Sequence, residues 1–357
     1  MKPAITLRER QSDAPGRIEY LDAAKGIFIL LIMTEHHLCG AEWVNRYLYS
    51  MGVPSFFLIS GFLYACKKEW ERPFGKNCVR KMQSLLYPYF TFSAIILLWN
   101  FVYYKVVSPF EVPEISFQKM FLYSVSTYGY HAVWYLPTAL WGTLVFFALR
   151  RAKRHGLIWA VFSVGLVVFY VLFDKRLTGL GLISYVYCYL FRISVAVVLI
   201  YAGSVLFSAF NNINRTQENL LLMICAVFSV VVAVLYKQYP EHFDYANVAV
   251  HRMGNPYVYF PAAISSTIVV MLLCKKLPGR KKLLTYFGRN SLILMGLHMD
   301  VTIRIARWLY AKFHFDFGEV IDSLIIIGME LLMFPVIITL IHKLFPFILS
   351  PRRRANR

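Results

Sequence analysis

Glu35, His36 and His37 follow one another within an otherwise apolar run at residues 21–40. A charged side chain at the centre of a membrane-spanning helix costs about 2.5–3.5 kcal/mol or more, so such residues are usually functional or paired. Lys25 lies 11 positions before His36, which places both on one helix face, about 16 Å apart along the axis. Because histidine titrates near neutral pH, His36, with Glu35 beside it, could act as a general base or a proton relay. The alternative is a buried histidine that only bonds a neighbouring helix.

Another histidine is expected at a similar depth on a different helix. His298 follows Arg289 by nine positions, or about 14 Å of helix. It would meet His36 in a shared active site, or bond within the bundle. Trp134, with His131 shortly before it, stands at the outer end of a further span. There it would stack on a sugar, or belong to the aromatic belt at the membrane interface.

No metal site is expected. His36 and His37 are adjacent and point apart on a helix, and no histidine three or four positions away completes a face. The six cysteines are scattered without a CxxC pair, so they suggest neither a metal site nor a disulfide framework.

Hydropathy shows which elements must position these residues. The chain of 357 residues is 58% hydrophobic and only 16% charged, whereas soluble domains carry about a quarter charged residues. These values predict an all-α, polytopic membrane protein with about ten transmembrane helices. The expected spans are 25–41, 47–65, 83–104, 132–149, 157–173, 180–209, 219–236, 256–274, 286–303 and 320–342. The first and ninth spans are the weakest, because polar residues interrupt them.

The distribution of Lys and Arg predicts the orientation. Of 38 such residues, 27 fall in the tails and in every second loop, while the intervening loops hold 10. The positive-inside rule therefore places both termini in the cytoplasm. The net charge of +19 then reflects which loops face the cytoplasm, and nucleic acid is not an expected partner. We predict a cytoplasmic tail at 1–24 without a cleavable signal peptide, a transmembrane domain at 25–349 and a basic tail at 350–357.

Further polar residues in the spans and outer loops allow several interpretations. The intramembrane charges Arg192 and Glu330 could pair with each other or line a cavity. Ser60 and Gly61 are typical of close helix packing. An outer loop carries polar residues that could bind a glycan, although a solvated loop is the simpler interpretation: Glu241, His242, Asp244, His251 and Arg252.

Five segments, in order, resemble the membrane acyltransferase family known as acyltransferase 3. They are YLDAAKGIFILLIMTEHH (20–37), VPSFFLISGFLY (53–64), LLYPYF (85–90), VWYLPTALWG (133–142) and FGRNSLILMGLH (287–298). The family signature is a basic residue, ten residues and then histidine in the first helix, which Lys25 and His36 match. The form LD-x-x-K-G in a short chain looks most like members that O-acetylate cell-surface sugars. Many relatives have Arg at the position of Lys25, and some carry a fused hydrolase-like domain that this chain lacks.

The resemblance implies an O-acyltransferase that moves acetyl from acetyl-CoA to a hydroxyl of a glycan or a lipid-linked sugar. The enzyme would reside among the lipids of a membrane, most simply the bacterial cytoplasmic membrane. Catalysis would involve His36, Glu35 and His298, and the acceptor would contact Trp134 and His131. The basic side chains of Lys25, Arg80 and Lys81 would pair with phosphates of coenzyme A. The family commonly has two basic residues three apart in this loop, whereas Arg80 and Lys81 are adjacent.

Two other classes of function remain open from the sequence. A proton-coupled transporter of a small solute would also bury Glu and His in its spans. It predicts internal repeats or paired broken helices, and neither is visible in the sequence. A non-catalytic membrane assembly subunit would leave the spacing of Lys25 and His36 unexplained.

Overall fold

The computed structural model describes residues 18–37, 42–107, 113, 115–243, 246–277, 281–313 and 317–346. Within these residues the secondary structure is helical, apart from one isolated bridge between Asn247 and Arg252. The predicted all-α class is therefore confirmed. Most of the predicted N-terminal tail and the whole basic C-terminal tail lie outside the described residues.

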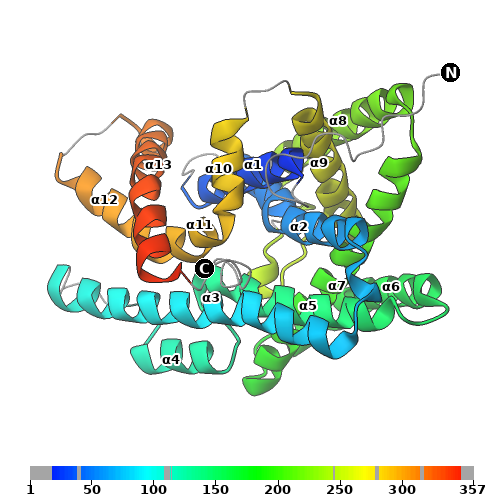
Figure 1. The fold of residues 1–357 in the computed structure, drawn as a ribbon. Coiled ribbons are helices and arrows are strands. Elements are labelled where there is room, and N and C mark those ends of the chain that lie inside the picture. Colours follow the sequence, from blue (N-terminus) through cyan, green and yellow to red (C-terminus); the bar gives the residue numbers. More distant parts are fainter. Residues whose placement is uncertain are drawn as a thin grey trace.

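The helices form a bundle. In the view of Figure 1, α3 runs below α1, α2 and α10 to α13. Their bounds are α1 Glu19–Glu35, α2 Glu42–Cys66, η1 Glu69–Glu71, α3 Phe74–Val102, η2 Tyr103–Val107, α4 Phe117–Val125, η3 His131–Trp134, α5 Tyr135–Leu149, α6 His155–Leu177, α7 Leu182–Asn212, α8 Arg215–Gln238, η4 Val248–Val250, α9 Pro256–Lys276, α10 Lys282–Arg289, α11 Ser291–Leu297, η5 His298–Thr302, α12 Ile303–Ala311 and α13 Glu319–Leu344.

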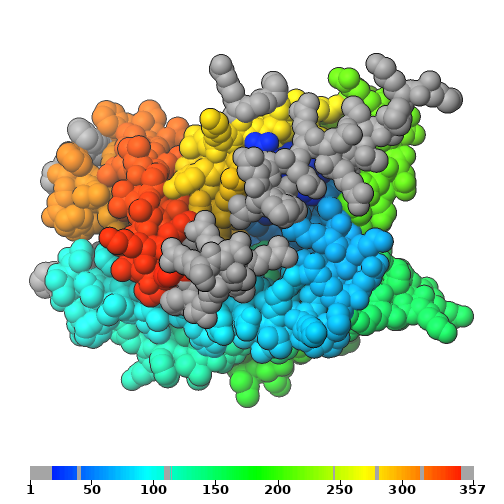
Figure 2. All heavy atoms as spheres, viewed as in Figure 1, coloured from blue at the N-terminus to red at the C-terminus, as the bar shows by residue number. Residues whose placement is uncertain are grey.

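Eight of the described helices are long and apolar enough to cross a membrane. They correspond to eight of the ten predicted spans, including the long sixth span, which is the single 31-residue helix α7. Only 6% of the most apolar stretch of α6 is buried within the protein, and 22% of that of α8. These two helices therefore present apolar sides to the bilayer. Figure 2 shows α3, in blue to cyan, as a long band across one face, with the end of α13 in red above it.

The first and ninth spans differ from the prediction. The first was expected at 25–41, but α1 ends at Glu35, and His36 and His37 form a turn. The turn is tightened by two short-range backbone bonds, from the His36 N–H to the Met33 carbonyl at 3.2 Å and from the His37 N–H to the Thr34 carbonyl at 3.1 Å. His36 therefore caps α1 instead of lying inside a longer helix.

The ninth span, expected as one helix at 286–303, is interrupted twice. Asn290 separates α10 from α11 with a non-helical backbone (φ −107°, ψ 10°). The π-helical turn η5 then begins at His298 and leads into α12. Such π-helical turns occur frequently at functional sites. Here the turn contains both His298 and Asp300.

Glycine lets α1 and α10 cross with their backbones in contact. A Cβ atom at Gly288 would lie 1.7 Å from the Asp22 carbonyl oxygen, and one at Gly26 would lie 2.0 Å from the Leu284 carbonyl oxygen. No side chain fits between the helices at this crossing. Because α1 leads to His36 and α10 leads through α11 to His298, the crossing sets the distance between the two histidines.

Close backbone contact at glycine residues also joins α2 to α7. A Cβ at Gly61 would lie 1.8 Å from the Ile200 carbonyl oxygen, and a Cβ at Gly203 would lie 1.9 Å from the Leu58 carbonyl oxygen. The prediction of close helix packing at the Ser60–Gly61 pair is confirmed for Gly61. This crossing holds α7 against α2 and thereby fixes where Arg192 enters the bundle.

The short helix α4 lies beside α3 (Figure 1). Its N-cap is Ser116, whose Oγ accepts a bond from the Lys119 backbone N–H. At its other end, the hydroxyl of Tyr89 on α3 donates to the carbonyls of Tyr123 and Ser124, each at 2.9 Å. These bonds anchor the segment that runs from α4 into η3, which carries His131 and Trp134.

Candidate active site

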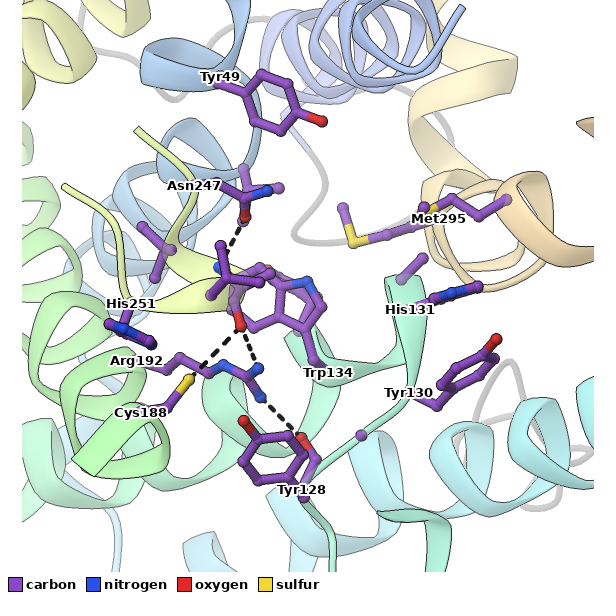
Figure 3. A pocket seen from close by; sticks show the side chains of 18 of the residues that line it. Tyr49, Tyr128, Tyr130, His131, Trp134, Cys188, Arg192, Asn247, His251 and Met295 are labelled. Carbon is purple, nitrogen blue, oxygen red and sulfur yellow. Dashed lines mark hydrogen bonds between the residues drawn. The ribbon is translucent and has the colours of Figure 1, made fainter. Parts of the chain in front are cut away.

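A cavity of about 520 Å³ opens among the ends of α1, α2, α7 and α11 and the two segments before α5 and α9. Its volume falls in the range of about 300–1,000 Å³ typical of small-molecule sites. Five of the predicted site residues line it: Glu35, His36, His131, Trp134 and His298. Both segments belong to loops predicted to lie outside the cytoplasm. Figure 3 shows the wall that carries Trp134, His131 and Arg192.

His36 and His298 lie together, as expected from their similar depth. Their ring centroids are 5.2 Å apart, and His298 is only 1% exposed. The Nδ1 of His298 lies 3.1 Å from the Leu294 carbonyl oxygen and 3.0 Å from that of Met295, so Nδ1 carries the hydrogen and donates it. Its Nε2 has no hydrogen-bond partner among the described residues. The lone pair on Nε2 therefore makes His298 a proton acceptor beside His36.

His36 has polar neighbours on both ring nitrogens. Its Nδ1 is 3.4 Å from the Tyr49 hydroxyl, and its Nε2 is 3.6 Å from Glu35 Oε1. The Glu35 side chain is only 2% exposed, and Gly52 leaves room for its Oε2. This arrangement keeps an ionisable carboxyl, an imidazole and a phenol around one point of the cavity.

His37 points away from the cavity into a buried polar cluster. Its Nε2 lies 2.7 Å from Glu330 Oε2 on α13, and the Thr302 hydroxyl donates to the other carboxyl oxygen. The Ser323 hydroxyl donates to the His37 carbonyl at 2.6 Å. Glu330 therefore pairs with His37, so of the two alternatives for Arg192 and Glu330 the structure does not show the mutual pairing. The cluster fixes the turn that carries His36.

Arg192 follows the other predicted alternative and lines the cavity. Its Nη1 donates to the Tyr128 carbonyl at 2.9 Å, and its Nη2 donates to the Ala249 carbonyl. The guanidinium carbon also lies 4.4 Å from the centre of the Tyr128 ring and 5.3 Å from that of Trp134. Figure 3 shows these bonds joining α7 to the segments on either side. Arg192 thus clamps two separate loops into one cavity wall.

Trp134 is buried, with 8% of its surface exposed, and its ring belongs to the cavity wall. It is therefore not a lipid-facing belt residue. Gly129, with φ +82°, allows the preceding chain to fold back, since a Cβ there would lie 2.3 Å from the Trp134 Cα. His131 lies between them, and its Nδ1 is 2.8 Å from Asp300 Oδ1.

The outer loop, for which a solvated loop was the simpler interpretation and glycan binding the alternative, divides in the structure. His251 lines the cavity, whereas Glu241 and His242 lie outside it. Burial lowers the pKa of His251, and the Arg192 charge acts in the same direction, against that of Asp174. His251 is thus held towards its neutral form. Asp244 lies outside the described residues.

The three predicted donor contacts do not line the cavity, and two of them share one carboxylate. Glu69 Oε2 lies 2.8 Å from Arg80 Nη2 and 2.9 Å from Lys81 Nζ. Burial opposes ionisation of Glu69, but Lys81 and Arg80 outweigh it and lower the pKa of this carboxyl. The Lys81 ammonium also lies 4.0 Å from the centre of the Tyr64 ring.

Lys25 belongs to the same electrostatic neighbourhood. Burial lowers the pKa of Lys67, partly offset by Glu69, and the nearby charges of Lys25 and Lys81 lower it further. Lys25 Nζ itself lies 3.3 Å from Asp22 Oδ1. Lys25, Lys67, Arg80 and Lys81 thus gather at the end of the bundle that the charge distribution predicts to be cytoplasmic. We call them the basic cluster.

Sequence reasoning missed two groups that shape this site. Asp300 was not singled out, although an acid within the apolar ninth span, two positions after His298, is the signal that would have found it. Tyr49 was also missed. One tyrosine among 24 carries no signal of this kind.

Comparison with protein families gives a match to the acyltransferase domain of acyltransferase family 3 over residues 18–344 of the 357. The match extends from the residue before α1 to the end of α13, so the chain belongs to this family and is a multi-pass membrane acyltransferase. Membership favours acyl transfer over the transporter interpretation. Comparisons with curated proteins and with solved structures give no match.

Proposed function

We propose that the protein transfers acetyl from acetyl-CoA to a hydroxyl of a cell-surface polysaccharide or glycolipid. The observation that carries the proposal is the pair of His36 and His298 at the wall of an aromatic cavity. A proton acceptor beside an ionisable imidazole suits the transfer of an acyl group to oxygen, in which a hydroxyl must lose a proton.

The cavity wall supports a sugar acceptor. Aromatic rings offer flat apolar faces, and phenols and the indole add polar edges that can bond hydroxyls. The rings that line the cavity are those of Tyr49, Tyr123, Tyr128, Tyr130, Trp134, Tyr135 and Tyr185. In our proposal Trp134 provides the stacking face, and His131 lies beside the acceptor.

The basic cluster supports a polyanionic donor at the opposite end. Coenzyme A carries its phosphates at one end of a long pantetheine arm and the thioester at the other. Lys25, Arg80 and Lys81 would hold the phosphates in the cytoplasm. The arm would then follow α1 over the roughly 16 Å of helix from Lys25 to His36.

In this scheme a sugar oxygen forms a bond to the acyl carbon while the bond from carbon to sulfur breaks. His36 either accepts the hydroxyl proton or donates a proton to the leaving sulfur, and His298 Nε2 exchanges that proton with it. Glu35, whose Oε1 lies 3.6 Å from His36 Nε2, would orient the imidazole. Donor and acceptor would approach from opposite sides of what we propose is a bacterial cytoplasmic membrane.

The test uses purified full-length protein in lipid nanodiscs with radiolabelled acetyl-CoA. Soluble acceptors are glucose, N-acetylglucosamine and glucuronic acid, and water serves as acceptor when no sugar is added. His36→Ala should lower acyl transfer by about 10²–10⁴-fold. His242→Ala is the matched control, since His242 is 72% exposed and lies outside the cavity.

Normal turnover by a folded His36→Ala protein would refute the role of His36. A wild-type protein that moves a solute into proteoliposomes, but releases no coenzyme A with any acceptor, would refute acyl transfer and favour a transporter.

A further inference from the structure

One histidine of the cavity wall, His131, is held in an unfavourable backbone conformation. His131 opens η3 with φ +42°, in the sparsely populated left-handed region. Non-glycine residues held there cost about 1–3 kcal/mol and cluster at functional sites. Thr127 and Gly129, shortly before His131, also have positive φ, so the whole turn that leads into η3 uses left-handed backbone conformations. The position of the His131 ring is therefore set by the fold.

Behind this ring lies a buried carboxylate. Asp300 is 0% exposed, and its Oδ1 lies 2.8 Å from His131 Nδ1. The same oxygen is 3.5 Å from Asn100 Nδ2 and 3.7 Å from Arg304 Nη2. A carboxylate accepts hydrogen bonds, so the hydrogen of the neutral ring sits on Nδ1 and the lone pair on Nε2.

The ring of His131 forms part of the cavity wall. The His131 side chain is 22% exposed and lines the cavity together with His36 and His298, whereas Asp300 lies behind it. Tyr130 stacks on the imidazole with ring centroids 3.8 Å apart, which fixes the plane of the ring. Figure 3 shows His131 on the wall between Tyr130 and Met295.

Among the described side chains, three of the four histidines that line the cavity, His36, His131 and His298, differ in the oxygen atoms that lie near their ring nitrogens. His298 bonds two backbone carbonyls, and His36 lies 3.6 Å from the nearest oxygen of Glu35. His131 has a carboxylate at hydrogen-bond distance, which orients the ring and stabilises the imidazolium that forms when Nε2 takes a proton.

We propose that His131, oriented by Asp300, is the base that takes the proton of the acceptor hydroxyl. The acceptor oxygen bonds the acyl carbon, and the hydroxyl proton passes to His131 Nε2. The electron pair of the broken bond stays on sulfur, which receives a proton from His36. This division of roles rests on the proposed function. Asp300 touches no substrate and is a positioning residue.

The experiment measures release of the coenzyme A thiol by the full-length protein with acetyl-CoA and the sugars named above, or with water. His131→Asn is the main variant, because asparagine tolerates a left-handed backbone and can still donate to Asp300, but is not a base. It should lower kcat about 10²–10⁴-fold and leave the acceptor KM close to that of the wild type. His242→Asn is the control for the substitution itself.

A second pair of variants separates acid–base catalysis from a structural role. His131→Gly keeps the backbone conformation accessible and leaves space for free imidazole, which should raise its kcat in proportion to the concentration of neutral imidazole. Asp300→Asn should lower kcat without changing the acceptor KM, and imidazole should not restore it.

Wild-type kcat in His131→Asn, alongside an inactive His36→Ala protein, would overturn the role of His131 and leave the proposed function standing. So would a His131→Gly rate that stays flat with imidazole. Absence of coenzyme A release by the wild-type protein with every acceptor would instead overturn the proposed function and this inference together.

Discussion

The crossing of α1 and α10 can be tested by adding a single methyl group. In Gly288→Ala the new Cβ would lie 1.7 Å from the Asp22 carbonyl oxygen and 2.7 Å from its carbonyl carbon. Ordinary van der Waals contact begins near 3.4 Å, so the helices must move apart by about 1.7 Å. Both atoms belong to the backbone of α1, and no change of rotamer relieves the clash.

The displacement should reach the proposed catalytic pair. His36 caps α1, and His298 follows α11, which continues from α10. Their rings are 5.2 Å apart, and a misplacement of about 1 Å can cost about 10²-fold in rate. Gly288→Ala should therefore lower acyl transfer at least about 100-fold. It should also destabilise the protein by about 1–3 kcal/mol, as overpacked cores do.

The assay combines acetyl transfer in nanodiscs with thermal melting of the same preparation. Gly26→Ala tests the crossing from the other helix, since its Cβ would lie 2.0 Å from the Leu284 carbonyl oxygen. Gly165→Ala on α6 is the matched control, because nothing lies within 4 Å of its Cβ. Gly288→Ala with wild-type rate and melting temperature would refute the reasoning. An equal loss in Gly165→Ala would show that the effect is not local.

Three further predictions concern other parts of the protein. The pKa of Glu69 is lowered in the folded state, so its stabilisation is present above its ordinary pKa of 4.5 and is lost as pH falls through the folded value. Melting temperatures of wild type and Glu69→Gln should therefore differ at pH 7 and converge in acid; a gap independent of pH would contradict this. Glu330→Ala should lower stability by about 1–3 kcal/mol because it leaves His37 unpartnered, whereas Glu330→Gln should retain most of it, as measured by denaturant melts. Trp134→Ala should raise the acceptor KM about tenfold and leave the KM for acetyl-CoA unchanged, while Trp134→Phe should lie near wild type; equal changes in both KM values would argue against a stacking role.

The sequence predicted those features that depend on local periodicity. The alternation of basic and less basic loops predicted α7 as one helix, and helix geometry predicted that His36 and His298 reach a similar depth. The family match also agrees with the resemblance read from five short segments.

The features that sequence could not predict depend on partners distant along the chain. α1 stops at Glu35, where α13 provides bonds to His37, including one from Ser323 across 286 positions. Asp300 contacts His131 across 169 positions, and the type and position of one residue do not indicate the other as its partner. Arg192 binds backbone carbonyls, which every residue possesses, so no side-chain type could reveal its partners.

The clamp at Arg192 also bears on how the protein is made. Synthesis proceeds from the N-terminus, so the Tyr128 carbonyl precedes α7 and the Ala249 carbonyl follows it. While α7 leaves the translocon, the guanidinium of Arg192 therefore has the first acceptor and lacks the second. A charge within a membrane-spanning helix costs about 2.5–3.5 kcal/mol when it is not satisfied. That cost is relieved when the segment before α9 arrives. This part of the cavity wall is therefore completed late in biogenesis, and a nascent chain that stalls before Ala249 leaves a membrane helix with a half-satisfied arginine.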